Sequence, residues 1–255
     1  MENQYDWKQI TNNLNNLLRL HTTPIGIQMI KKLKDLEQIP KLRKPNKTHS
    51  VCQFMGQAIH LGFTIAIIAD YVAGNNCKGI CGLGPQTDEW KSGQQFKKVW
   101  FETEQDAMAH KEQIRYIPYG KYEALVVSPL SSERIQPDVC MILAKPAQMF
   151  MLLSGYIRND YAPLDCDFIG ESSCSATWVK AFNTGKPSLS LPCFAELRYG
   201  GYSPNELVLG ITPADLIKAI EGVKELGKIG LRYPVPPYSP QSNILEGLSK
   251  NYDKI

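Results

Sequence analysis

The sequence predicts an α/β or α+β fold, in which a mixed sheet is flanked by helices. Short β-branched or apolar runs alternate with longer amphipathic segments along all of the chain. The chain has 255 residues, 43% hydrophobic and 21% charged, which is ordinary for a globular protein with an ample core. No linker-like segment divides it, so residues 1–255 are predicted to form one domain. Its core should span about residues 20–226, followed by a proline-rich tail over residues 233–255.

In the first half, Ile10, Leu14 and Leu17 fall on one face of an amphipathic helix that ends before Pro24. Ser50 and Gln53 have the capping-box spacing that begins a second helix. A β-branched, apolar run over residues 64–72 indicates a strand. The elements predicted here are a helix over 5–20, a strand over 25–30, a helix from 50 to about 61, a strand over 64–72, helical residues 87–112 and a strand over 123–130.

In the second half, Pro146 follows an apolar run and suits the first position of a helix. Thr212, followed by Pro213 and Asp215, has the residues that begin a final amphipathic helix. The elements predicted here are strands over 139–145, 188–191 and 206–211, and helices over 146–157, 172–182 and from 212 onward.

Four of the seven cysteines form a pattern that occurs twice. Cys52 lies two residues after Ser50 at a predicted helix start, and Cys77 follows after the next strand. Cys174 lies two residues after Ser172 at another predicted helix start, and Cys193 again follows after a strand. The repetition suggests a diverged internal duplication. If the halves pack face to face, the four thiols converge, and four thiolates are the ligand set of an iron–sulfur cluster or a structural zinc ion.

The local sequence also favours a metal centre. A cysteine in the first turn of a helix meets free backbone N–H groups and the positive end of the helix dipole, so we expect thiolates at Cys52 and Cys174. Glycines near Cys77 allow amides to approach its sulfur. Dispersed single cysteines favour a cluster, of the 4Fe-4S type, because zinc ribbons use paired Cys-x-x-Cys motifs. Zinc, or reduced thiols without any metal, are the alternatives.

The other three cysteines are expected to have different roles. Cys140 lies within an apolar strand and should pack in the core, and Cys166 should be structural. Cys81, four residues after Cys77, competes as a ligand.

Composition also bears on location and partners. The N-terminus lacks a secretion signal and the longest apolar run is too short to span a bilayer, so we expect a cytoplasmic protein without membrane contact and with reduced thiols. A net charge of +3 is too small to indicate nucleic-acid binding, so no nucleic-acid partner is expected, and the basic cluster 41–47 is interpreted as a solvated loop.

Several motifs resemble a bacterial and archaeal family known as the domain of unknown function numbered 169. The resemblance covers roughly residues 20–226. The segments that carry it are Pro137-Asp138-Val139 with Ala144-Lys145-Pro146-Ala147-Gln148, Cys77-Lys78-Gly79 with Leu83-Gly84, Leu191-Pro192-Cys193 with Arg198, and Asn205-Glu206-Leu207-Val208. Lys78 replaces a proline of the family pattern, and the glycine between Cys193 and Arg198 is absent. The resemblance implies a fold and the cysteine set, and no particular reaction.

The sequence therefore predicts an iron–sulfur redox protein, with a cluster held by Cys52, Cys77, Cys174 and Cys193. It would act in electron transfer or reductive chemistry of anaerobic metabolism, on a redox partner protein or a small-molecule substrate, alone or as a homo-oligomer. Arg198 is a further candidate for binding an anion beside Cys193. One alternative is a small-molecule-binding protein with structural cysteines. Another is a thiol-dependent enzyme with Cys52 or Cys77 as nucleophile.

Overall fold

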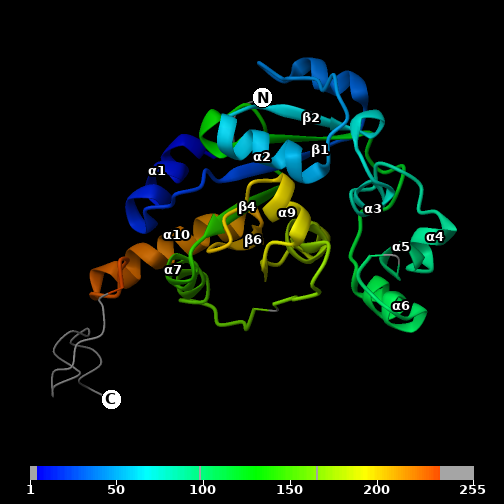
Figure 1. The fold of residues 1–255 in the computed structure, drawn as a ribbon. Coiled ribbons are helices and arrows are strands. Elements are labelled where there is room, and N and C mark those ends of the chain that lie inside the picture. Colours follow the sequence, from blue (N-terminus) through cyan, green and yellow to red (C-terminus); the bar gives the residue numbers. More distant parts are fainter. Residues whose placement is uncertain (1–4, 98, 165, 236–255) are drawn as a thin grey trace.

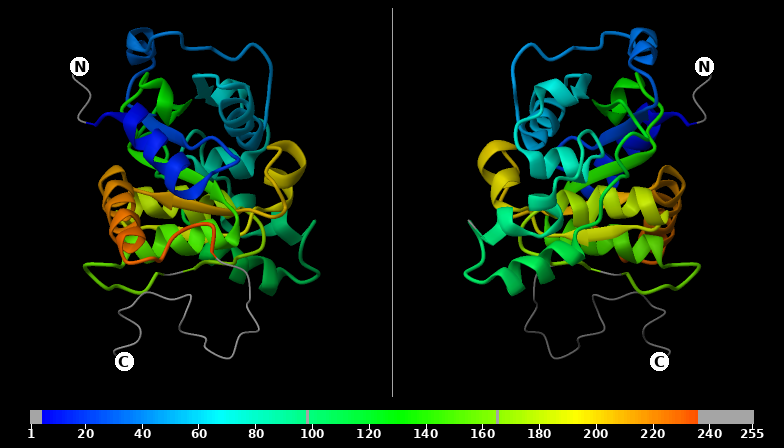
Figure 2. Two further views of the ribbon diagram at one scale, coloured as in Figure 1. Left: turned by 90° about the vertical axis from the view of Figure 1, so that its left-hand side faces the viewer. Right: turned by 90° about the vertical axis from the view of Figure 1, so that its right-hand side faces the viewer.

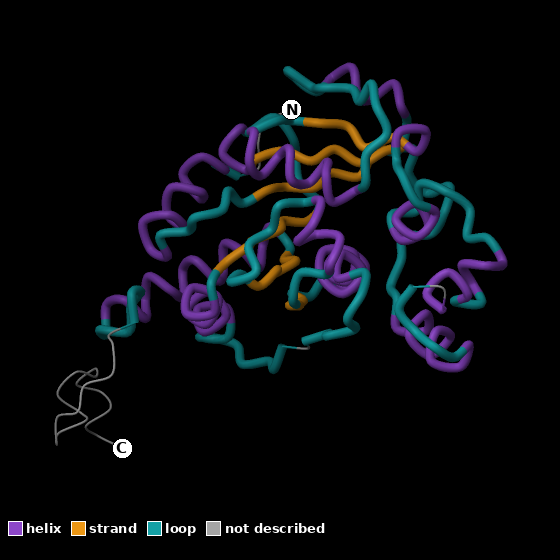
Figure 3. The backbone as a smooth tube through the Cα atoms, in the orientation of Figure 1, coloured by secondary structure: helices purple, strands orange, loops and turns teal. Residues whose placement is uncertain are grey.

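A six-stranded sheet with helices on both faces forms the centre of the molecule (Figures 1 and 3). The structure, a computed structural model, describes residues 5–97, 99–164 and 166–235. It confirms the predicted class of mixed helices and strands. All paired strands run antiparallel, and parallel pairing among the described residues is limited to isolated bridges.

The sheet has the strand order β2-β3-β1-β4-β6-β5. Its strands are β1 (Ile25–Ile30), β2 (Ile65–Ile68), β3 (Ala124–Pro129), β4 (Val139–Ala144), β5 (Ser188–Ser190) and β6 (Leu207–Ile211). Apart from two glycines, one serine and one glutamine, five of the six strands contain only apolar side chains. These are buried or half-buried, because helices or loops cover both faces.

The strand order repeats about the centre of the sheet. In each half, the third strand in sequence lies between the other two, and the first strands, β1 and β4, pair with each other. A residue ahead of the cysteine-bearing helix also bridges the edge strand in parallel in each half, as Arg43 does to Ile65 and Cys166 to Leu189. The topology therefore agrees with the predicted duplication, and the antiparallel pair β1–β4 relates the two halves.

One face of β4, β5 and β6 is covered by three long helices. These are α1 (Trp7–Leu18), α7 (Pro146–Tyr156) and α10 (Pro213–Lys228), and they enclose one apolar cluster (Figure 2). The opposite face of the sheet is covered by α2 (Val51–Leu61), a π-helical segment η4 (Ser175–Val179) and α8 (Lys180–Thr184). Side chains of β4 alternate between the two faces. Met141 packs in the apolar cluster under α2, η4 and α8, whereas Cys140 packs under α1, α7 and α10, in the core as predicted.

The connection between β2 and β3 forms a lobe at one side of the sheet (Figure 1). It contains α3 (Asn75–Ile80), α4 (Asp88–Lys91), α5 (Gln94–Lys97) and α6 (Glu104–Gln113). The expectation of a helical segment over residues 87–112 was therefore wrong in its continuity, because Gly93, at φ +73°, separates α4 from α5.

Three other expectations are corrected in detail. The strand over 64–72 ends at Ile68 and continues as a 3₁₀ turn, η2 (Ala69–Tyr71). The helix over 172–182 begins after Ser172, which has φ +63°, and includes the π-helical turns of η4. A short helix, α9 (Phe194–Tyr199), follows Cys193 and was not predicted. Two further 3₁₀ segments are η1 (Leu33–Gln38) and η3 (Leu130–Ser132).

Among the helices of the described residues, none combines the length and the apolar character needed to cross a bilayer.

Candidate functional site

The four repeated cysteines lie on the face of the sheet that α2 and η4 cover. Cys52 is in the first turn of α2, Cys77 is in α3, Cys174 immediately precedes η4, and Cys193 is the N-cap residue of α9. None is in a disulfide, and all but the half-buried Cys77 are buried.

Contacts between these segments bring the sulfurs together. The backbone N–H of Val51, at the start of α2, donates to the Cys77 sulfur. The thiol of Cys52 donates to the Cys193 sulfur. Cys174 is electrostatically coupled to both Cys77 and Cys193. The four cysteines, which come from four segments of the chain, therefore lie near enough to influence one another electrostatically.

Cys193 is held by a network that the sequence analysis did not identify. Its backbone N–H donates to the Ser173 hydroxyl at 3.1 Å and to the Glu196 carboxylate at 3.0 Å. The Ser173 hydroxyl also donates to Glu196, and the Glu196 backbone N–H donates to the Cys193 sulfur. Glu196 stands three residues after Cys193, which is the capping-box spacing that could have revealed it.

The electrostatics single out Cys193 as the thiolate of the group. The Cys52 thiol, together with the backbone N–H groups of Glu196 and Ser173, lowers the pKa of Cys193 to about 5 despite its burial. The same hydrogen bond raises the pKa of Cys52, and burial raises that of Cys174. The expectation of thiolates at Cys52 and Cys174 is thus wrong for the metal-free protein, because a negative neighbour and desolvation outweigh the helix dipole.

Two carboxyl groups beside Cys193 are shifted in the opposite direction. Burial, followed by the negative charge of Cys193, raises the pKa of Glu196 to about 8. The same causes raise the pKa of Glu171 to about 7. Both groups thus hold protons more tightly than ordinary glutamates, which limits the negative charge gathered in this buried place.

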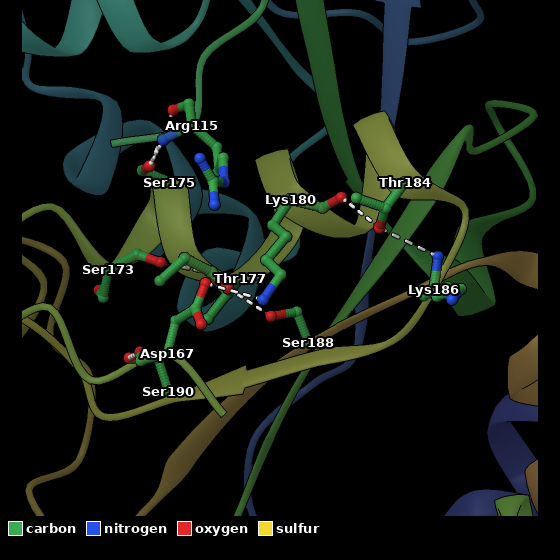
Figure 4. A network of polar contacts seen from close by, with 11 residues as sticks. Arg115, Asp167, Ser173, Ser175, Thr177, Lys180, Thr184, Lys186, Ser188 and Ser190 are labelled. Carbon is green, nitrogen blue, oxygen red and sulfur yellow. Dashed lines mark hydrogen bonds and ion pairs between the residues drawn. The ribbon is translucent and has the colours of Figure 1, made fainter. Parts of the chain in front are cut away.

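A framework of polar contacts fixes the segment that carries Cys174 (Figure 4). Ser175 exchanges hydrogen bonds with the backbone of Arg115 at 2.6 and 2.7 Å. Lys180 forms an ion pair with Asp167 at 2.8 Å, and Ser188 of β5 donates to a backbone carbonyl of the π-helical turn at 2.6 Å. Cys174 is therefore positioned by the lobe on one side and by the edge strand on the other.

The lobe is also tied to the segment before Cys174. The Asn76 amide donates to the Ser172 hydroxyl at 2.9 Å and accepts a hydrogen bond from the Trp90 indole at 3.1 Å. Because Asn76 precedes Cys77, this contact joins a cysteine of the first half to one of the second.

Within the described residues, no three histidine, cysteine or carboxylate side chains are arranged around a point as ligands of one metal ion. The four sulfurs are thus neighbours without a preformed tetrahedral site of the kind that a structural zinc ion occupies.

The remaining candidates lie around this centre or away from it. Cys81 is buried in the core behind Cys77, Cys166 is exposed, and Arg198 is exposed on α9. Gln148 caps α7 and donates to two carbonyls at the end of α1, so it acts as a structural residue. His49 and His60 lie at either end of α2 and line a surface hollow.

Over 131 residues the chain is 28% identical to an uncharacterised protein of Methanocaldococcus jannaschii, and this region spans 49% of the chain and 56% of that protein. The match thus covers little more than half the length of this relative. No solved structure matches. Residues 13–222 match the profile of the domain of unknown function 169, described as "Uncharacterised ArCR". This protein therefore belongs to that family.

Proposed function

We propose that the protein binds one iron–sulfur cluster, of the 4Fe-4S type, through Cys52, Cys77, Cys174 and Cys193. The observation that carries the proposal is that four free cysteines, two from each half of the repeated strand order, influence one another electrostatically. Its function would be electron transfer or reductive chemistry in anaerobic metabolism in the cytoplasm. A redox partner protein or a small-molecule substrate would exchange the electrons.

The donor set fits such a cluster. Four cysteine thiolates are its usual ligands, and hydrogen bonds from backbone amides to sulfur tune its potential. Amides of Val51 and Glu196 already donate to two of the four sulfurs. The raised pKa values of Cys52 and Cys174 belong to the metal-free protein, because a bound cation strongly favours the thiolate.

The test is anaerobic reconstitution with iron and sulfide. We expect a brown protein with about four irons and four sulfides per chain, and loss of most of this iron in each of Cys52→Ser, Cys77→Ser, Cys174→Ser and Cys193→Ser. Cys166→Ser, which changes an exposed cysteine outside the centre, is the matched control. A colourless wild-type protein after reconstitution, or equal iron in all variants, would exclude the cluster. Binding of a single zinc ion to the same four residues would show that the site is a zinc site and not a cluster site.

A second candidate function is thiol chemistry, and the environment of Cys193 favours it. A thiolate beside a second thiol, Cys52, is the arrangement of a redox-active dithiol. The nucleophile would then be Cys193, in place of the Cys52 or Cys77 expected from the sequence. Iron analysis separates the two candidates, since the thiol enzyme would be active without metal and would lose its activity in Cys193→Ser.

A further inference from the structure

Two adjoining hollows lie along α2, outside the cysteine centre. The first has a volume of about 330 Å³ and is lined by Arg43, Lys44 and His49. The second has a volume of about 350 Å³ and extends past His60 to Tyr199, at the end of α9. The two share His49 and Gln57 in their lining, so they adjoin each other, and together they are called the depression here. Its combined size suits a small organic molecule.

The charge of this depression is one-sided. Arg43 and Lys44 lie at one end, and no aspartate or glutamate occurs among the described residues that line either hollow. Within the described part of the chain, no ion pair involves Arg43 or Lys44. Two cationic side chains without a carboxylate partner make this end attractive to an anion.

The cationic end is held in place by the sheet. Arg43 donates its backbone N–H to Thr64 at 2.8 Å and accepts from Ala66 at 3.0 Å, and its guanidinium stacks on the Phe63 ring at 3.3 Å. Pro45, two residues on, is buried. The basic residues of the cluster 41–47 are exposed, as expected of a solvated loop, and the bridge from Arg43 to Ile65 holds this loop beside β2 and the hollow.

The helices of the two halves are covered to different extents. The long β2–β3 connection, which forms the lobe, packs on η4 and α8: Arg115 binds Ser175, and Asn183 donates to the Tyr116 carbonyl at 2.9 Å. The β5–β6 connection packs on α2, but it is shorter and covers only part of that helix. A Cβ on Gly56 would lie 2.4 Å from the Gly200 carbonyl oxygen, which marks that contact. On this helix His60 and Leu61 are exposed, and Gln53 and Gln57 are half-buried.

We propose that this depression binds a small organic anion, with its phosphate or carboxylate group at Arg43 and Lys44 and its body along α2 toward Tyr199. Gln53 and Gln57 offer hydrogen bonds along that path. A helix rises 1.5 Å per residue, so Gln57 lies roughly 8 Å along the axis from Cys52. The ligand would thus lie on the same helix as the cysteine centre. Binding itself depends on no metal.

The test measures anion binding by the whole protein at constant ionic strength. Pyrophosphate represents phosphates, citrate represents carboxylates, and chloride is the reference; melting temperature and calorimetric titration are the readouts. We expect one of the two anions to raise the melting temperature above that in chloride. Which one does so distinguishes a phosphate ligand from a carboxylate ligand. An equal melting temperature in all three salts would overturn the proposal.

Two double variants then locate the site. Arg43→Gln with Lys44→Gln should weaken the affinity about tenfold or more, because it removes both positive charges that would donate hydrogen bonds to the anion. Lys41→Gln with Lys47→Gln removes the same charge from the same segment outside the hollow, and should leave the affinity within about twofold. Equal losses in both double variants would show a nonspecific charge effect and contradict the site.

Two further measurements keep the outcome unambiguous. Since Arg43 also stacks on Phe63, Lys44→Gln alone is included as a variant that spares this contact, and it should still weaken binding. All titrations are repeated before and after iron reconstitution. Anion binding by iron-free protein would support this site even if no cluster forms, whereas a cluster without anion binding would refute only the site.

Discussion

At the scale of single residues, one sulfur differs from its neighbours. Cys193 is the N-cap of α9 and receives hydrogen bonds from the Cys52 thiol and two backbone amides, which stabilise its negative charge. Burial instead raises the pKa of Cys77 to about 11. Four similar residues thus differ in acidity, because Cys52 gives its hydrogen bond to Cys193, whereas Cys77 and Cys174 lack enough donors to offset desolvation.

This difference predicts the reactivity of the metal-free protein. A small alkylating reagent should modify Cys193 as a thiolate at pH 7, with a rate that falls only as the pH drops through about 5. An ordinary thiol reacts faster as the pH rises toward about 8.5. Peptide mass spectrometry across pH 4–9 measures each rate. A Cys193 rate that rises up to pH 8.5 would contradict the assignment.

Glu196 predicts a stability difference that depends on pH. Its pKa is raised to about 8 in the folded protein, so its contribution to stability is complete below the unfolded value near 4.5 and is lost as the pH rises through 8. Glu196→Gln mimics the protonated acid and should remove this loss. The free energy of unfolding of Glu196→Gln minus that of the wild type should therefore rise between pH 4.5 and 8, by on the order of a few kcal/mol.

Urea titrations of the metal-free protein at several pH values give this difference. The contribution of Cys193 to stability has the opposite pH dependence, since its lowered pKa adds stability as the pH rises. Both proteins contain Cys193, so the comparison is between proteins that share this contribution. Glu221→Gln, on the exposed side of α10, is the matched control substitution. A constant difference for Glu196→Gln would mean that this carboxyl is ionised in the folded state.

At the scale of elements, the closest helix contact is the crossing of α7 and α10. Gly155 and Gly222 face each other there, and a Cβ on Gly222 would lie 2.0 Å from the Gly155 carbonyl oxygen. Only glycines permit this approach, which brings the apolar faces of both helices onto β4 and β6.

Gly222→Ala should therefore destabilise the protein by about 1–3 kcal/mol or more, because the two helices must separate. At Gly227, in the same helix, an added Cβ would meet no atom within 4 Å. Gly227→Ala should therefore stabilise the protein by about 0.5–1 kcal/mol. Chemical denaturation of both variants measures the contrast. Equal effects would show that the crossing tolerates a wider spacing.

The elements also show what could be read from the sequence. Strands and long helices were predicted because periodicity and caps such as Ser50 and Thr212 are local signals. The break at Gly93 and the π-helical turns after Cys174 depend on tertiary contacts, such as that between Ser175 and Arg115. The cysteine pattern predicted a site, and the spacing of Cys193 and Glu196 is a local signal that could have revealed this carboxyl group, whereas the role of Ser173, which is distant from Cys193 in the chain, required the fold.

At the scale of the whole molecule, the proposed ligands come from both halves of the fold. A cluster bound to all four sulfurs would join the lobe, α2, η4 and α9 (Figure 1). A ligand that binds only the folded state stabilises that state, and metal bonds between distant segments stabilise it strongly.

The reconstituted protein should therefore melt several degrees above the metal-free protein. Differential scanning calorimetry under exclusion of oxygen measures the shift, which Cys166→Ser should retain and Cys174→Ser should lose. A cluster-loaded protein that melts at the temperature of the metal-free form would place the cluster at the periphery of the fold.

The parallel bridges described for Arg43 and Cys166 have one more consequence. β2 and β5 are the outermost strands, and each has an extended segment of its own chain lying against its outer side. Open strand edges invite pairing with other chains and growth into fibrils, and a covering segment prevents that. At these two edges the protein therefore presents loops, and not open strands, to other molecules. A deletion of residues 41–47 should expose the edge of β2 and increase aggregation.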